Sequence, residues 1–349
     1  MSASLATLTV AIPSYQRPQY LRECLDSIVS QPEARDSRFS ILICDNSPDD
    51  ESERAIDDLL EAFPNIRYQR NETNIGAAGN VLRVVERSPG DFVWMMSDDD
   101  IHLPGSLARV FAEIDTQPVL NGMLLNQRHY HTDMKTMVSF KNRDLAARAG
   151  NRNRHFISGE EALRCFCFHI GAVSTLIVRR SLWNEIIAEK PTSEYFQEYV
   201  MSFIYGKAAL QGGHFSYIND VILACRTGND SWVLRGAFTE RLRLVVQGGE
   251  QLASELFVEF PATRREFRRH TCRVFTGAAV RNFLVAGATA RFRWDALRLC
   301  GATYADLTEF YKYILPSLSL PRPVLRGLQQ WRARRAVRPE TGLQAPALQ

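Results

Sequence analysis

The sequence of 349 residues predicts an α/β fold, with a Rossmann-like, mostly parallel sheet, helices on both faces and a helical region at the C-terminal end. Short apolar runs alternate with amphipathic stretches of about a dozen residues, as in sheets built from strand–helix–strand units. A polar cluster follows each run, and the pattern becomes helical and basic in the last third of the chain. We therefore expect a sheet domain at residues 1–235, a helical region at 236–338 and a disordered tail at 339–349.

The alternation is clearest at the start of the chain. Leu8–Ile12 is an apolar run that Pro13 ends, and Pro18–Ser30 follows with apolar residues at helical spacing. The pattern continues with strands and helices in turn: Phe39–Cys44, Asp49–Phe63, Ile66–Arg70, Gly76–Arg87, Asp91–Met96 and Pro104–Asp115. Parallel strands need such crossover helices, so this order predicts a parallel sheet.

The next hundred residues are less regular. Residues 131–157 are polar and basic without periodicity, which is typical of a solvated loop. The alternative is a mobile loop that covers the site or meets an anionic acceptor. Ser158–Phe168 predicts a helix that begins with a capping box, and Ser174–Val178 and Ile222–Ala224 predict further strands.

Three consecutive carboxylates, Asp98, Asp99 and Asp100, follow the buried strand at Asp91–Met96. Adjacent carboxylates raise one another's pKa, so a folded protein keeps them ionised with a cation or with many hydrogen-bond donors. Oxygen ligands suit Mn²⁺ or Mg²⁺, which retain waters and share a site with substrate phosphates. Taken alone, the segment fits equally well as a polar turn whose aspartate caps the helix at Pro104.

The three earlier strands also end in polar residues, at Pro13–Arg17, Asp45–Ser47 and Arg70–Asn71. Each cluster by itself is typical of turns and helix caps, but the carboxyl ends of parallel strands converge at one edge of a sheet. There, Tyr15, Asp45 and Arg17 supply an aromatic wall, a carboxylate and a cation, which together suit a nucleotide. The sequence contains neither a dinucleotide-binding glycine motif after the first strand nor a P-loop.

Charge is distributed unevenly along the chain. Residues 1–231 carry 23 Lys/Arg and 30 Asp/Glu, whereas residues 232–338 carry 19 and 8. The basic part favours an anionic membrane surface as partner, and the alternative is that its arginines face solvent or a sister subunit of a homo-oligomer. Nucleic acid is not expected, because no RNA-binding aromatic signature or zinc finger occurs. Seven scattered cysteines and the lack of a signal or membrane-spanning pattern predict a cytoplasmic protein, peripheral at the inner face of the cytoplasmic membrane if the membrane is the partner.

Four segments resemble the inverting family 2 glycosyltransferases, which have the type-A nucleotide-sugar-binding fold: VAIPSYQRPQYLRECLDSI, ILICDNSPDDES, NETNIGAAGN and SDDDIHLP. The resemblance covers roughly residues 6–235. It implies a nucleoside-diphosphate sugar donor bound by Pro13, Tyr15, Arg17, Asp45, Asn74, Gly76, Asn80 and Asp98. It also implies that Asp99 ligates the metal, with Asp100 as a further ligand or a supporting group. Arg226 is a candidate diphosphate clamp, and Trp232 a candidate platform for the sugar.

Transfer of a sugar to a hydroxyl also needs a general base. In the family this is an acidic residue at the head of a helix after the metal motif, which implies Glu194 here. Tyr195 stands where a second acid is common, so Glu198 is the alternative.

These observations predict a metal-dependent glycosyltransferase that acts on a free or lipid-linked saccharide acceptor in cell-surface polysaccharide biosynthesis. A nucleotidyltransferase of the same general fold is an alternative, although PSYQRP lacks the glycine- and lysine-rich first loop. A non-catalytic nucleotide-sugar-binding or scaffold protein is another, because the second acid is missing.

Overall fold

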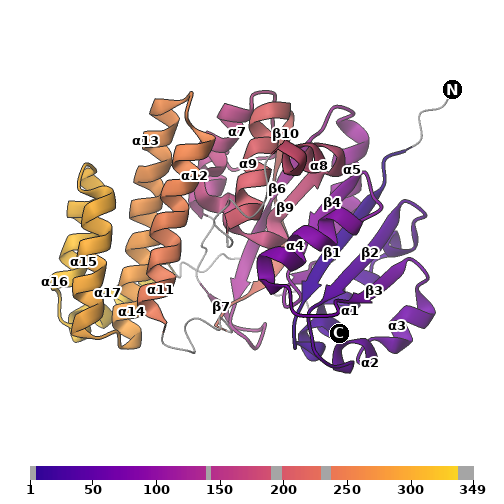
Figure 1. Cartoon of the computed structure of the whole chain (residues 1–349), viewed down its shortest axis with the longest axis horizontal. Coiled ribbons are helices and arrows are strands. Elements are labelled where there is room, and N and C mark those ends of the chain that lie inside the picture. Colours follow the sequence, from indigo (N-terminus) through magenta and orange to yellow (C-terminus); the bar gives the residue numbers. More distant parts are fainter. Residues whose placement is uncertain (1–4, 139–142, 190–198, 229–236, 337–349) are drawn as a thin grey trace.

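The computed structural model describes residues 5–138, 143–189, 199–228 and 237–336 (Figure 1). Its strands are β1 (Leu8–Ser14), β2 (Phe39–Asp45), β3 (Ile66–Arg70), β4 (Phe92–Met95), β5 (Ile101–His102), β6 (Gly122–Tyr130), β7 (Met137–Val138), β8 (Arg154–Phe156), β9 (Leu176–Arg179) and β10 (Phe215–Arg226). Around them lie the helices α1 (Pro18–Val29), α2 (Glu51–Arg54), α3 (Asp57–Ala62), α4 (Gly76–Arg87), α5 (Ser106–Thr116), α6 (Arg143–Arg148), α7 (Gly159–Phe166), α8 (Arg180–Glu189) and α9 (Val200–Gly212).

These strands form one sheet in the order β3-β2-β1-β4-β9-β6-β10-β5, with β7 beside β6 and β8 beside β10. Strands β1 to β4 are parallel, with Ser14 level with Asp45 at the ends of β1 and β2. Strand β9 runs antiparallel to both β4 and β6, and β6 is parallel to β10. One edge of the sheet therefore gathers the ends of β1, β2, β3, β4, β6 and β10 together with the start of β9.

The predicted strands of the first hundred residues are present, and α4 has the predicted bounds. Two helix predictions are wrong in detail. The stretch predicted as one helix, Asp49–Phe63, forms α2 and α3, because the chain turns at Ile56 to bury that side chain. Helix α5 begins only at Ser106, since Gly105 has a left-handed backbone (φ 80°) that a helix cannot include, and Pro104 lies outside it.

The prediction of a solvated loop at residues 131–157 is also wrong, because this stretch contains β7, α6 and β8. Strand β8 pairs antiparallel with the start of β10 and buries Phe156. This segment is ordered because β8 pairs with a strand that is distant in the sequence, and such pairing leaves no periodic pattern in the residues. One of the two hydrogen bonds of the predicted capping box is present: Ser158 Oγ accepts from the backbone N–H of Glu161 at 3.4 Å.

The C-terminal region consists of α11 (Phe238–Arg243), α12 (Gly249–Leu256), α13 (Pro261–His270), α14 (Gly277–Ala286), α15 (Ala290–Tyr304), α16 (Leu315–Ser319) and α17 (Arg322–Ala336), with π-helical turns at η6 (Leu244–Gly248), η7 (Thr271–Thr276) and η8 (Phe310–Ile314). It stands beside the sheet, opposite the β3 end (Figure 1). Leu252, Leu256 and Phe267 of α12 and α13 belong to the same apolar core as α7 and α9, whereas α14 to α16 surround a separate core. The region is thus anchored in the sheet domain by burial.

Within the described residues, no helix is long and apolar enough to cross a membrane. All seven cysteines are buried and none forms a disulfide.

Candidate active site

Asp98 and Asp99 lie in the turn between β4 and β5, where they are 4% and 7% exposed. Asp98 accepts from Ser14 Oγ at the end of β1 (2.9 Å) and from Arg17 Nη1 (3.3 Å). Asp99 accepts from the same Nη1 at 3.1 Å and from the hydroxyl of Ser97. The structure therefore brings together the polar ends of β1 and β4, as the sequence predicts.

Asp100 has different partners. Its Oδ2 accepts from Ser174 Oγ at 2.6 Å, and its Oδ1 accepts from the backbone N–H of Arg226 at 2.8 Å. Asp100 thereby joins the end of β4 to the turn η3 (Val173–Thr175), which precedes β9, and to the end of β10. The interpretation of an aspartate in this turn as the cap of the following helix is wrong, because Gly105 occupies that position and no side chain caps α5.

The carboxylates concentrate more negative charge than their neighbours offset. Burial raises the pKa of Asp98 to about 6, and the charge on Asp99 acts in the same direction against the opposing effect of Arg17. Burial and then Asp99 raise the pKa of Asp100 as well. A divalent cation would relieve the same repulsion, so this set of buried carboxylate oxygens fits Mn²⁺ or Mg²⁺.

Among the described residues, no group of three His, Cys, Asp or Glu side chains is arranged to hold a metal ion. Beside phosphates, Mg²⁺ is usually held by one or two carboxylates, with waters and phosphate oxygens completing the shell.

Asp45 ends β2 and is fully buried. Its Oδ1 accepts from the backbone N–H and the hydroxyl of Ser47 (2.9 and 2.7 Å), and its Oδ2 accepts from Tyr68 Oη at 2.6 Å. The backbone N–H of Gln16 donates to Ser47 Oγ at 2.7 Å, which joins the loops after β1 and β2. Beside this network Tyr15 is 45% exposed, so its ring is free to pack against a ligand.

A chain of asparagines fixes helix α4 against the strand ends. Asn80 is buried, donates to the carbonyl of Cys44 at 2.8 Å and accepts from Asn71 Nδ2 at 2.9 Å. Gly76 has a left-handed backbone (φ 77°) and donates its N–H to Asn74 Oδ1 at 2.9 Å, which closes the turn before the helix. Asn80 therefore holds α4 against the strand ends from a buried position, while Asn74 and Gly76 are exposed.

Comparison with known proteins identifies this arrangement. Residues 9–170 match the model of glycosyl transferase family 2. The chain contains a family 2 glycosyltransferase domain. It is 27% identical over 280 residues to the abequosyltransferase RfbV of Salmonella typhimurium, which covers 74% of this chain and 78% of that protein. The predictions of the family and of a glycosyltransferase activity are confirmed.

Two solved structures share the fold of this glycosyltransferase. Residues 1–349 of S. aureus TarS match with a TM-score of 0.58 at 15% identity, over 95% of this chain and 89% of that one. A mannosyltransferase from Pyrobaculum calidifontis, solved with GDP-Man and Mn²⁺, gives 0.50 at 14% identity over 94% and 88%. The predicted type-A fold with a helical C-terminal region is confirmed, with β5, β7, β8 and β9 as antiparallel members of the sheet.

Arg226 of the glycosyltransferase lies at the same edge, but its guanidinium group already bonds to other groups of the protein. Its Nε donates to the carbonyl of Asp99 at 3.0 Å, and the group pairs with Glu23 and lies 4.5 Å from the ring centre of Tyr20. It also donates to the carbonyl of Thr132. Through these contacts Arg226 holds the carboxylate turn in place. Its direct contact with a diphosphate stays a prediction.

The predicted base candidates, Glu194 and Glu198, and the predicted platform Trp232 lie outside the described residues. Pro13, the remaining predicted donor contact, is partly buried in β1 beside Cys44 of β2.

Three residues at this edge of the sheet were not predicted as site residues from the sequence. Ser14, which donates to Asp98, sits inside the quoted first motif and could have been singled out as the last residue of β1. Tyr68, the partner of Asp45, shows only as one aromatic residue in a strand. Ser174 gives no signal, because its contact with Asp100 joins residues 74 positions apart in the sequence.

Proposed function

We propose that this glycosyltransferase moves a sugar from a nucleoside-diphosphate sugar to a hydroxyl of a saccharide acceptor, in the biosynthesis of a cell-surface polysaccharide, and that it requires Mn²⁺ or Mg²⁺. The observation that carries the proposal is the convergence of Arg17 and the carboxylate turn with the Asp45 network at one sheet edge. The abequosyltransferase and the GDP-Man- and Mn²⁺-bound mannosyltransferase among its relatives support the same chemistry.

Arg17 is suited to the diphosphate of the donor. Both of its contacts with Asp98 and Asp99 use Nη1, which leaves Nε and Nη2 for phosphate oxygens. The side chain is 32% exposed, so a ligand can reach it. Tyr15 would cover the base, and Asp45 would hydrogen-bond it.

In the carboxylate turn, Asp99 would hold the cation and Asp98 the ribose of the donor. A bound divalent cation would offset the charge that develops on the departing nucleoside diphosphate. Ser97 and Arg17 orient Asp99, while Asp100, fixed by Ser174, keeps the turn in place and stands as the further ligand candidate.

The general base is Glu194 in this proposal, with Glu198 as the alternative. It takes the proton of the acceptor hydroxyl as the new bond to the anomeric carbon forms and the bond to the diphosphate breaks. Attack from the face opposite the leaving group inverts the anomeric configuration.

The basic C-terminal region would hold the enzyme at the inner face of the cytoplasmic membrane, close to a lipid-linked acceptor. On α17, Val324, Leu328 and Trp331 are 45%, 42% and 51% exposed and follow one another at i, i+4 and i+7. Arg322 and Arg326 lie exposed on the same helix. An apolar stripe flanked by arginines is typical of helices that lie on anionic bilayers.

A thermal-shift panel of UDP-, GDP-, CDP- and dTDP-sugars, with Mn²⁺ or with EDTA, tests the donor class. We expect one nucleotide to stabilise the protein in Mn²⁺ and to lose that effect in EDTA, because a ligand stabilises only the state that binds it. Turnover should release a nucleoside diphosphate and no pyrophosphate. Stabilisation that is equal in EDTA would contradict the metal requirement, and absence of any nucleotide effect would contradict the proposed donor.

A further inference from the structure

Arg17 bonds to both of the carboxylates that lead the carboxylate turn. Its Nη1 lies 3.3 Å from Asp98 Oδ1 and 3.1 Å from Asp99 Oδ2. A single nitrogen of the protein's own cation therefore donates to two acids at once. Arg17 comes from the loop between β1 and α1, whereas the acids come from the turn after β4, so this contact joins two separate loops of the site.

The guanidinium of Arg17 and a divalent cation compete for these acids. Asp98 and Asp99 are 4% and 7% exposed, so little water lies around them to screen one positive charge from another. A cation held by Asp99 would be close to a guanidinium that bonds to the same carboxylate, and like charges at short range weaken one another's binding. Arg17 should therefore lower the affinity of the free enzyme for Mn²⁺ or Mg²⁺.

The side chain of Arg17 is free to change partner. Among the described residues, its ion pairs are those with Asp98 and Asp99, and both use Nη1. Guanidinium groups bind phosphate oxygens in pairs, so Nε and Nη2 can meet a diphosphate while Nη1 still bonds to the turn. The side chain can then leave the turn without passing through an unpaired state.

The two carboxylates keep other supports when Arg17 leaves. Asp98 Oδ2 accepts from Ser14 Oγ at 2.9 Å, and Asp99 Oδ1 accepts from the hydroxyl of Ser97. Both donors are short side chains that lie on β1 or directly beside the turn. The turn should therefore keep its shape during the exchange.

We propose that Arg17 couples the cation to the donor: it holds Asp98 and Asp99 in the free enzyme and passes to the diphosphate of the donor as the cation binds. This rests on the proposed metal-dependent glycosyltransfer and concerns the regulation of that site. Since Arg17 opposes the cation only while no diphosphate is present, the donor strengthens cation binding, and the cation strengthens donor binding by the same factor.

The test measures the affinity of the full-length protein for Mn²⁺ without nucleotide, by the electron paramagnetic resonance of free Mn²⁺. It is done at pH 8, above the pKa of about 6 that burial gives Asp98, so that protons compete little with the metal. We expect Arg17→Gln to bind Mn²⁺ at least about threefold more tightly than the parent, because a competing positive charge is removed.

Arg22→Gln is the matched control. Arg22 lies on α1, is 35% exposed where Arg17 is 32% exposed, and pairs with Asp26 and Asp58 instead of the carboxylate turn. It loses the same charge, so its Mn²⁺ affinity should equal that of the parent. Equal tightening in both arginine variants would show a general effect of net charge and would overturn the proposal.

A second arm adds the nucleotide among UDP, GDP, CDP and dTDP that stabilises the parent most in Mn²⁺. In the parent this nucleotide should strengthen Mn²⁺ binding by at least about fivefold. In Arg17→Gln that factor should shrink, and the nucleotide itself should bind more weakly, because a phosphate contact is lost. One substitution thus changes metal and nucleotide affinity in opposite directions.

A merely supporting role for Arg17 predicts a different result. If Arg17 only kept the carboxylates in place, Arg17→Gln would bind Mn²⁺ alone as weakly as the parent or more weakly, and that result would overturn the proposal. Arg17→Lys retains the charge and should bind Mn²⁺ close to the parent value, and its melting temperature checks that the fold persists. Tightening in Arg17→Lys equal to that in Arg17→Gln would also refute the exchange.

The outcomes separate this inference from the proposed function. A parent protein that binds no Mn²⁺, even with nucleotide, would refute the metal requirement and the role of Arg17 with it. A parent in which nucleotide strengthens Mn²⁺ binding by the same factor as in Arg17→Gln would refute only the exchange, and the metal-dependent donor site would stand.

Discussion

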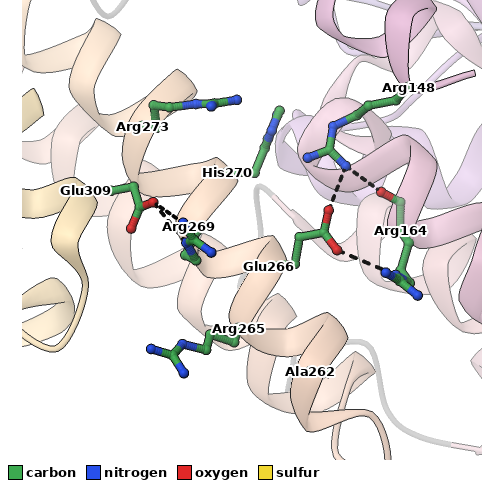
Figure 2. A pocket seen from close by; sticks show the side chains of 9 residues that line it. All are labelled: Arg148, Arg164, Ala262, Arg265, Glu266, Arg269, His270, Arg273 and Glu309. Carbon is green, nitrogen blue, oxygen red and sulfur yellow. Dashed lines mark hydrogen bonds and ion pairs between the residues drawn. The ribbon is translucent and has the colours of Figure 1, made fainter.

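The carboxylate edge of the sheet, where β4 leads into Asp98 and Asp99, and the boundary with the C-terminal region differ in how firmly their charged side chains are held. At the edge, Asp98 is 4% exposed and takes two hydrogen bonds from neighbours on β1 and the following loop. At the boundary, a cavity of about 530 Å³ lies between α6 and α7 on one side and α13 and η7 on the other. We call it the arginine pocket, because the described residues that line it include five arginines (Figure 2): Arg148, Arg164, Arg265, Arg269 and Arg273.

The charged side chains of the arginine pocket are exposed. Arg164 and Arg269 have more than half of each side chain in solvent. Glu266 pairs with Arg164 at 3.5 Å, and Glu309 pairs with Arg269 at 2.8 Å. Exposed ion pairs stabilise a structure little, whereas a buried, fixed group such as Asp98 suits chemistry that depends on geometry.

The edge also bears the charges that the donor would meet. The edge presents carboxylates, which repel a diphosphate unless a cation lies between them, and Arg17 is the cation that pairs with Asp98 and Asp99 there. Changes at the edge should therefore affect turnover, whereas changes on the exposed surface of the C-terminal region should not.

The largest effect is expected from Glu194→Gln. Removing a general base that accepts the proton of the acceptor should lower kcat by about a hundred- to ten-thousandfold. Nucleotide affinity, measured by thermal shift in Mn²⁺, should stay close to that of the parent. Glu198→Gln is the matched control and should lose far less activity. If Glu198→Gln has the larger loss, the base is Glu198, and unchanged turnover in both variants would remove both assignments.

Asp99→Asn should have the next largest effect, because it tests the fixed edge directly. The amide is isosteric and keeps an oxygen for Arg17, so the fold should persist, but the charge that holds the cation is lost. We expect turnover to fall by about a hundred- to thousandfold. The Mn²⁺-dependent part of nucleotide stabilisation should disappear with it.

Asp100→Asn is the control for this prediction. Both oxygens of Asp100 already accept hydrogen bonds, from Ser174 and from the backbone of Arg226. Loss of one should lower stability by about 1 to 3 kcal/mol while Mn²⁺ still binds. Loss of Mn²⁺ binding in this variant would instead show that Asp100 is the further ligand. A variant Asp99→Asn with the metal dependence of the parent would show that the cation is held elsewhere.

The sequence predicts the edge better than the pocket, for a physical reason. Buried strands such as Leu8–Ser14 consist of apolar runs, and a parallel sheet places their polar ends together whatever the details of packing. By contrast, Arg148 and Arg273 lie 125 positions apart and meet only because α13 packs on α7. No local pattern records that contact. Ser174 was missed for the same reason, since its contact with Asp100 joins residues 74 positions apart.

The smallest effect is expected on α17, where only membrane affinity should change. Leu328→Glu/Trp331→Glu places two charges in the exposed apolar stripe and should reduce flotation with phosphatidylglycerol vesicles several-fold. Point variants of the whole chain are needed, because deleting the C-terminal region would expose the core that Leu256 and Phe267 complete. Turnover of a soluble acceptor should be unchanged, since α17 does not contribute to the carboxylate edge. Equal flotation of parent and variant, or equal binding to uncharged phosphatidylcholine, would separate the basic half from the membrane.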